Sequence, residues 1–152
     1  MEDDNIVSLR KERIERYIEK MEHLHRYHQS LKKWVRNVDK KGFLSLKMKD
    51  QFAIYHGFQL IIEIITDLIA MLVKDLKIKP KDDYSNIECL QEQKILSETL
   101  SKNIKKMNGL RNVIVHDYNG MDELLAFNGI KENLKNVKKF DEVMRKWLRK
   151  NS

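Results

Sequence analysis

The chain has 152 residues, of which 41% are hydrophobic, and this is enough to bury the core of one domain spanning residues 1–152. It carries 30 Lys and Arg against 23 Asp and Glu, and the formal charge of +7 suits a polyanionic partner. Much of this charge alternates in sign along the chain, however, as solvated helix surfaces also do. Charge alone therefore leaves both interpretations open.

The composition excludes several protein classes. A single cysteine, Cys89, excludes an internal disulfide framework and favours a reducing compartment, so we expect a cytoplasmic location. Residues 1–5 are acidic where an export signal carries basic residues. The apolar stretch 58–73 contains Glu63 and Asp67 and is shorter than the roughly 20 residues that a membrane span needs. We expect it to be a buried core helix, with no membrane association.

Long helices are permitted nearly everywhere, because the chain has only one proline, Pro80, and five glycines. Apolar residues at intervals of three and four predict a first helix over about residues 6–39. Residues 40–42, Lys-Lys-Gly, break that pattern. A second helix is predicted over about residues 46–76, followed by a solvent-exposed linker at 77–85.

The second half predicts two more main helices and a short accessory helix at about residues 85–92. Ser97 is a good N-cap for a helix that runs to about residue 117. Asn119 and Gly120 tolerate the left-handed conformation that ends helices. The last helix spans about residues 121–150.

We expect this last helix to be bent or interrupted near residues 128–129, Asn-Gly. Together, the segments predict an all-α, up-and-down bundle of four main helices plus one short accessory helix.

Polar side chains on the second helix lie within an arc of about 100°. They are His56, Gln59, Glu63, Thr66 and Asp67. Because the remaining positions are almost all apolar, this polar seam interrupts an otherwise buried helix. It could be a simple solvent edge. Alternatively, it faces a cleft or a partner subunit, where Glu63 or Gln59 would orient catalytic groups.

The segment 111–118, Arg-Asn-Val-Ile-Val-His-Asp-Tyr, combines groups that handle a phosphodiester. The planar guanidinium of Arg111 can pair with two phosphate oxygens and stabilise charge that develops in a transition state. The imidazole of His116 can take a proton from a ribose 2′-hydroxyl or give one to a leaving 5′-oxygen. The segment therefore contains the side chains that cleavage of a phosphodiester would need.

Spacing constrains this site, because Arg111 and His116 are separated by about 140° around a regular helix. One copy of the chain would converge only loosely on a phosphate. A symmetric dimer could instead bring two copies of each side chain around one cleft. On spacing alone, an isolated Arg and His at a helix end are more often surface and capping groups.

Three histidines of the first helix, His23, His25 and His28, invite a metal-site interpretation. His25 and His28 would share a helical face. No further ligand sits at suitable spacing nearby, so we expect no metal site.

The segment 111–118 resembles the Arg-x4-His-x-Tyr signature of the HEPN superfamily, specifically the HepT-like toxins that pair with minimal nucleotidyltransferase antitoxins. Asn112, directly after the arginine, is also typical of that family. The preceding residues 107–110 resemble its lead-in to the motif. The apolar second helix with Gln59-x3-Glu63 is similar to the family's second helix, and the helix order matches over about residues 5–150.

This resemblance implies a homodimeric endoribonuclease toxin in which Arg111 and His116 cut RNA without a metal or other cofactor. Asn112, Glu63 and Gln59 would support them. It also implies that Tyr118 is adenylylated by a cognate nucleotidyltransferase antitoxin, which silences the toxin. The alternatives are a HEPN module that binds a nucleotide or partner without cleaving RNA, and a purely structural helical adaptor.

Overall fold

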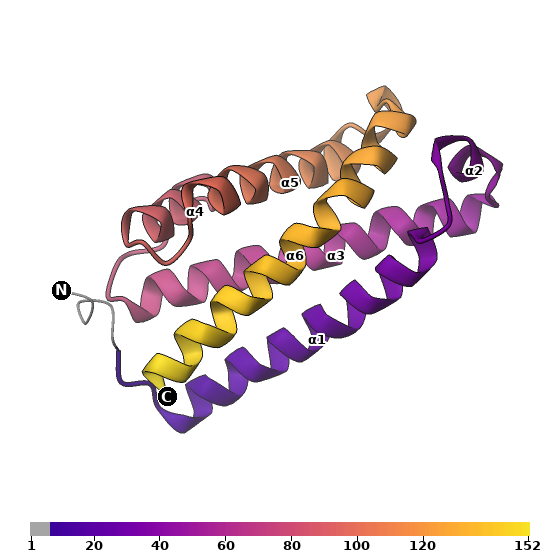
Figure 1. Cartoon of the computed structure of the whole chain (residues 1–152). Coiled ribbons are helices and arrows are strands. Elements are labelled where there is room, and N and C mark those ends of the chain that lie inside the picture. Colours follow the sequence, from indigo (N-terminus) through magenta and orange to yellow (C-terminus); the bar gives the residue numbers. More distant parts are fainter. Residues whose placement is uncertain (1–6) are drawn as a thin grey trace.

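Residues 7–152 are described by a computed structural model, and within them the chain forms helices and no β-strand. The long helices are α1 (Lys11–Val35), α3 (Met48–Asp75), α5 (Glu98–His116) and α6 (Glu123–Asn151), and the short elements are α2 (Lys40–Ser45), α4 (Asp83–Glu92) and the 3-10 turn η1 (Tyr118–Gly120). Helices α3 and α6 each pack against α1 and α5, which closes a four-helix bundle (Figure 1). The predicted all-α bundle is confirmed.

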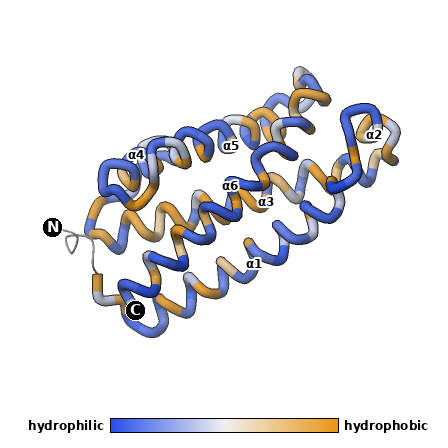
Figure 2. The backbone as a smooth tube through the Cα atoms, in the orientation of Figure 1, coloured by the Kyte–Doolittle hydropathy of each residue, from blue (hydrophilic) through white to orange (hydrophobic). Residues whose placement is uncertain are grey.

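Helix α3 supplies the centre of the core, as the apolar stretch predicts. Six of its side chains are completely buried: Phe58, Ile61, Ile62, Ile65, Leu68 and Leu72. Helices α1 and α6 alternate between hydrophobic and hydrophilic residues, as expected of amphipathic helices (Figure 2). By length and composition, α3 is the one helix among residues 7–152 that could cross a membrane, but half of its most apolar window is buried inside the bundle.

A short helix, α2, stands where the sequence predicts only a break, so that prediction is wrong. The Asp39 carboxylate accepts a hydrogen bond from the Gly42 backbone N–H at 2.7 Å and caps the helix. A Cβ at Gly42 would lie 3.0 Å from the same carboxylate oxygen, so the glycine permits the cap. The Phe43 side chain is fully buried and stacks on Phe127 of α6, with the ring centroids 4.6 Å apart. This packing stabilises α2.

Helix α1 is shorter than predicted, beginning at Lys11 and ending at Val35. Residues 1–6, which include the predicted start of this helix and the acidic segment 1–5, lie outside the described residues. Helix α4 begins two residues earlier than expected, because the Asp82 carboxylate accepts a hydrogen bond from the Ser85 backbone N–H at 2.8 Å. Ser97 caps α5 as predicted, accepting from the Leu100 backbone N–H at 3.1 Å.

The last helix, α6, is continuous through residues 128–129, so the predicted bend or interruption is wrong. A Cβ at Gly129 would lie 3.0 Å from Cδ2 of Leu110 on α5. The glycine therefore allows α5 and α6 to approach closely and does not break the helix.

Helix α5 ends at His116, and the predicted left-handed stop at Asn119 and Gly120 is also wrong. Neither residue has a positive φ. They lie in η1, and a Cβ at Gly120 would come within 2.8 Å of the Asp117 carboxylate. The glycine fits here because of this close approach. Left-handed backbone occurs instead at Lys77 and Lys94, which follow α3 and α4.

The two ends of the bundle differ. The C-terminus and the start of α1 lie at one end, and α2, η1 and the end of α5 lie at the other (Figure 1). At the first end, Asp75 of α3 accepts hydrogen bonds from the Tyr17 hydroxyl at 2.6 Å and from the Arg13 guanidinium at 2.9 Å. This network joins α1 to α3. The segment 111–118 lies at the opposite end of the bundle.

Candidate active site

Four of the predicted site residues form one hydrogen-bonded network between α3 and α5. The Arg111 guanidinium donates from Nη2 to Glu63 Oε1 at 3.0 Å and from Nη1 to Asn112 Oδ1 at 3.0 Å. Gln59 donates from Nε2 to the same Glu63 oxygen at 3.1 Å. The network holds the guanidinium in one orientation at the boundary of the bundle.

The charges of this network are partly screened from water. The Arg111 side chain is 23% exposed and the Glu63 side chain 38%. Burial by itself would raise the pKa of the Glu63 carboxyl, but hydrogen bonds from Arg111 and Gln59, and the charges of Arg111 and His56, together lower the pKa below its ordinary value. Glu63 is therefore held as a carboxylate that anchors the arginine.

The polar seam of α3 divides into two parts. Glu63 and Gln59 face α5, whereas Asp67 forms an ion pair with Lys20 of α1 at 3.4 Å. The Thr66 hydroxyl donates to backbone carbonyls of its own helix. The solvent-edge interpretation thus describes one part of the seam, and the interpretation as a face toward the motif describes the other.

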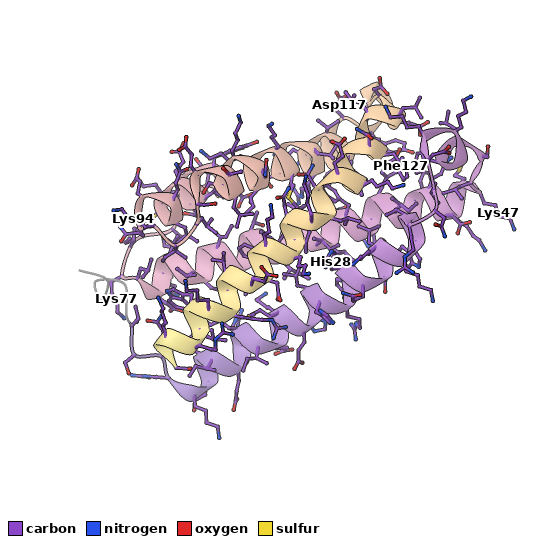
Figure 3. The ribbon with its side chains drawn as sticks, viewed as in Figure 1. His28, Lys47, Lys77, Lys94, Asp117 and Phe127 are labelled. Atoms are coloured by element: carbon purple, nitrogen blue, oxygen red, sulfur yellow. The ribbon has the colours of Figure 1, made fainter. Side chains whose placement is uncertain are left out.

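His116 is the last residue of α5 and its side chain is exposed. Within residues 7–152, no hydrogen bond joins it to Arg111, which points toward α3. The two side chains lie on different sides of the helix, as the predicted angle of about 140° requires. Asp117, the residue after His116, marks the end of α5 on the same end of the bundle as Phe127 and Lys47 (Figure 3).

Tyr118 lies just beyond the end of α5, in η1. Its spacing of seven residues from Arg111 would place both side chains on one face of a continuous helix, but the helix ends before Tyr118. Its half-buried ring instead packs edge-on against two aromatic rings of α3. The centroid distances are 6.0 Å to Phe52 and 5.7 Å to Tyr55. Burial, the charge of Glu123 and a hydrogen bond to that carboxylate all raise the pKa of the Tyr118 phenol.

Sequence reasoning missed the residues that hold Tyr118, which are Phe52, Tyr55 and Glu123. The Tyr55 hydroxyl is buried and has no hydrogen-bond partner among residues 7–152, and burial and the Glu123 charge raise its pKa. Phe52 precedes His56 by one helical turn, so the helical face that carries the polar seam could have identified it. Glu123 had no such signal, because it meets Tyr118 only across the η1 turn.

The three histidines of α1 do not form a cluster with other metal-binding side chains. In the part of the chain that the structure describes, no group of three His, Cys, Asp or Glu residues is placed to hold a metal ion. His28 is buried between α1 and α6, and burial lowers the pKa of its imidazole. His25 is exposed.

Comparison with known proteins identifies related chains. A curated protein of Archaeoglobus fulgidus named "Putative RNase" is 34% identical over 141 residues, which is 88% of this chain and 97% of that protein. The mRNA nuclease HepT of Shewanella oneidensis is 29% identical over 66 residues, covering 43% of this chain and 50% of that protein.

The fold is likewise that of a solved toxin structure. A tri-AMPylated Shewanella oneidensis HEPN toxin, solved in complex with its MNT antitoxin, superposes with a TM-score of 0.76 at 20% identity, covering 86% of this chain and 96% of that one. A family model described as Ribonuclease HepT-like matches residues 12–144. The chain therefore belongs to the HepT-like ribonuclease family.

Proposed function

We propose that this protein is the toxin of a toxin–antitoxin pair and an endoribonuclease that cuts RNA without a metal ion. The observation that carries this proposal is the Arg111 guanidinium held by Glu63 and Asn112 beside the α5 terminus that bears His116. Membership in the HepT-like ribonuclease family supports the same reaction class.

The chemistry follows from these groups. The ribose 2′-oxygen attacks the adjacent phosphorus, the bond from phosphorus to the 5′-oxygen breaks, and a 2′,3′-cyclic phosphate forms. A preoriented guanidinium stabilises the negative charge that develops on the phosphate oxygens. His116 carries one of the two protons that must move, because its exposed imidazole is free to reach a bound substrate.

The working unit in this proposal is a two-fold dimer. Within one chain Arg111 and His116 lie on different sides of α5, so a second copy would complete the site. Val113 and Val115, on either side of the buried Ile114, are each 38% exposed, which suits an interface. If each site takes Arg111 from one protomer and His116 from the other, mixing inactive Arg111→Ala and His116→Ala variants restores up to about a quarter of the activity.

Tyr118 is the proposed regulatory residue. The toxin of similar fold was solved as a tri-AMPylated protein with an antitoxin. By analogy, a cognate nucleotidyltransferase would adenylylate the Tyr118 phenol of this chain and so silence it. Mass analysis after coexpression should find the modification on wild type but not on Tyr118→Phe, which keeps the ring contacts with Phe52 and Tyr55. A cytoplasmic location stays a prediction from the single Cys89.

An RNA cleavage assay tests the proposed activity. Purified wild type should cut RNA in the presence of EDTA and leave DNA of the same sequence intact, since DNA lacks the 2′-hydroxyl. The His116→Ala variant should lose about 10²- to 10⁴-fold in rate, as expected for a general acid or base. Unchanged cleavage by His116→Ala would reject the assigned role.

The second candidate function is a module that binds a nucleotide or the antitoxin without cleaving RNA. The half-buried Tyr118 and its aromatic neighbours favour it, because they suit partner recognition as well as regulation. This alternative predicts tight binding of the nucleotidyltransferase and no cleavage product from any RNA.

A further inference from the structure

One face of α3 contacts the segment 111–118 at two separate positions. The Phe52 ring packs against Tyr118 with centroids 6.0 Å apart, and the Glu63 carboxylate binds Arg111 at 3.0 Å. Residues 52, 56, 59 and 63 fall within an arc of about 60° at 100° per residue. His56 therefore lies on the face between the two contacts, alongside the segment that carries the chemistry.

The His56 side chain is accessible to solvent. It is exposed, and among residues 7–152 no hydrogen bond or ion pair engages it. It lies on the same face of α3 as the Glu63 carboxylate. Burial raises the pKa of that carboxyl and hydrogen bonds from Arg111 and Gln59 lower it, and the charge of His56 lowers it further. An imidazole is thus free to meet a substrate bound by Arg111.

The chemistry requires a second proton carrier. Attack by the ribose 2′-oxygen releases one proton, and departure of the 5′-oxygen requires another. In the arrangement proposed above, each site takes His116 from one protomer only, and one imidazole can serve only one of these steps in a single turnover. The Glu63 carboxylate, which binds Arg111, lies on the same face of α3 as His56.

We propose that His56 is a second catalytic residue, which donates a proton to the leaving 5′-oxygen while His116 accepts the proton of the 2′-hydroxyl. The bond between the 2′-oxygen and phosphorus forms, and the bond between phosphorus and the 5′-oxygen breaks. One proton leaves the 2′-hydroxyl for His116, and one proton passes from His56 to the 5′-oxygen. This inference rests on the proposed ribonuclease function and assigns the proton donor of that site.

The decisive substrate is an RNA in which sulfur replaces the bridging 5′-oxygen at one position. Sulfur leaves as a thiolate and needs no proton, so the reaction no longer depends on the general acid. His56→Gln should cut ordinary RNA about 10²- to 10⁴-fold more slowly than wild type. It should cut the sulfur-substituted RNA at nearly the wild-type rate. His116→Gln should stay slow on both substrates.

The pH dependence gives an independent measure. A general acid must be protonated, so its loss removes the fall in rate on the alkaline side of the profile. His56→Gln should flatten that alkaline limb, and His116→Gln should flatten the acidic limb. A residue with only a structural role would move neither.

His25→Gln is the matched control, since it removes another exposed histidine on a different helix, and it should cleave both substrates like wild type. Thermal unfolding of each variant verifies folding, and His56→Asn provides a second variant with a smaller side chain. If His116→Gln is inactive but His56→Gln cuts ordinary RNA at the wild-type rate, the assignment of His56 is overturned and the ribonuclease function stands.

Equal slowing of His56→Gln on both substrates would also overturn the proton-donor role. If wild type cleaves none of the RNAs tested, the ribonuclease function itself is overturned, and the inference with it.

Discussion

Replacing Glu63 by alanine should separate the anchoring of Arg111 from the general effect of negative charge on α3. The substitution removes the acceptor of two hydrogen bonds, at 3.0 Å from Arg111 and 3.1 Å from Gln59. The side chains of Arg111 and Glu63 are 23% and 38% exposed, so solvent screens their charges. The ion pair therefore contributes at most about 1 kcal/mol to the free energy of unfolding. For a chain of this size the melting temperature should fall by about 2–4 °C.

The effect on activity should be larger than the effect on stability. Arginine has about 2 kcal/mol of rotamer entropy, and Glu63 removes part of that freedom before substrate binds. Losing all of this preorganisation would lower kcat/KM by up to about 30-fold, since about 1.4 kcal/mol corresponds to a factor of ten. Cleavage of RNA at constant pH and salt measures this value directly.

Asp67→Ala provides the control, because it removes one negative charge from the same helix but from an exposed pair with Lys20. It should leave kcat/KM nearly unchanged. The reasoning is refuted if Glu63→Ala matches wild type in both melting temperature and kcat/KM, or if Asp67→Ala lowers kcat/KM as strongly as Glu63→Ala.

The lowered pKa of Glu63 determines how its contribution to the stability of the fold depends on pH. A carboxyl whose pKa is lowered in the folded protein stabilises the fold above its ordinary pKa of about 4.3, and this stabilisation is lost as the pH falls through the folded value. The difference in melting temperature between wild type and Glu63→Ala should therefore shrink as the pH falls below about 4.

Three predictions concern stability. Burial lowers the pKa of His28, so the folded state binds fewer protons than the unfolded state. The melting temperature should therefore fall as the pH drops below about 6.5. The His28→Leu variant should show a smaller slope of melting temperature against pH in a series of thermal scans. Asp75→Ala leaves the buried Tyr17 hydroxyl without its acceptor and leaves the Arg13 guanidinium only the Met71 carbonyl at 3.4 Å, so it should cost about 1–3 kcal/mol in urea unfolding. A loss below the error of that titration would contradict the network. Ser97→Ala removes the N-cap of α5 and should cost about 1 kcal/mol, whereas Ser97→Gly should cost only a few tenths.

The helices could be predicted from sequence because their signals are local. The apolar intervals of α3 and the cap at Ser97 depend on residues within one or two helical turns. Gly42 and Gly129 misled because each glycine permits a close contact within a helix. Each glycine fits a close approach, at Gly42 to the capping Asp39 and at Gly129 to Leu110 of another helix, and neither ends a helix.

The site residues could be named from the motif and its resemblance, but their partners could not. Glu63 and Asp67 both belong to the polar seam of α3, yet they bind Arg111 on α5 and Lys20 on α1. Periodicity places both on one face without saying which neighbouring helix each one meets. Only the packing of α3 between α1 and α5 distinguishes the residue of the site from the residue of the solvent edge.

The most direct measurement uses a DNA strand that contains a single ribonucleotide, incubated in EDTA with wild type, Arg111→Ala and His116→Ala. The proposed function predicts that wild type cuts only after the ribonucleotide and leaves a 2′,3′-cyclic phosphate, and that both variants are strongly impaired. Cleavage at deoxynucleotides, or wild-type rates from either variant, would contradict it.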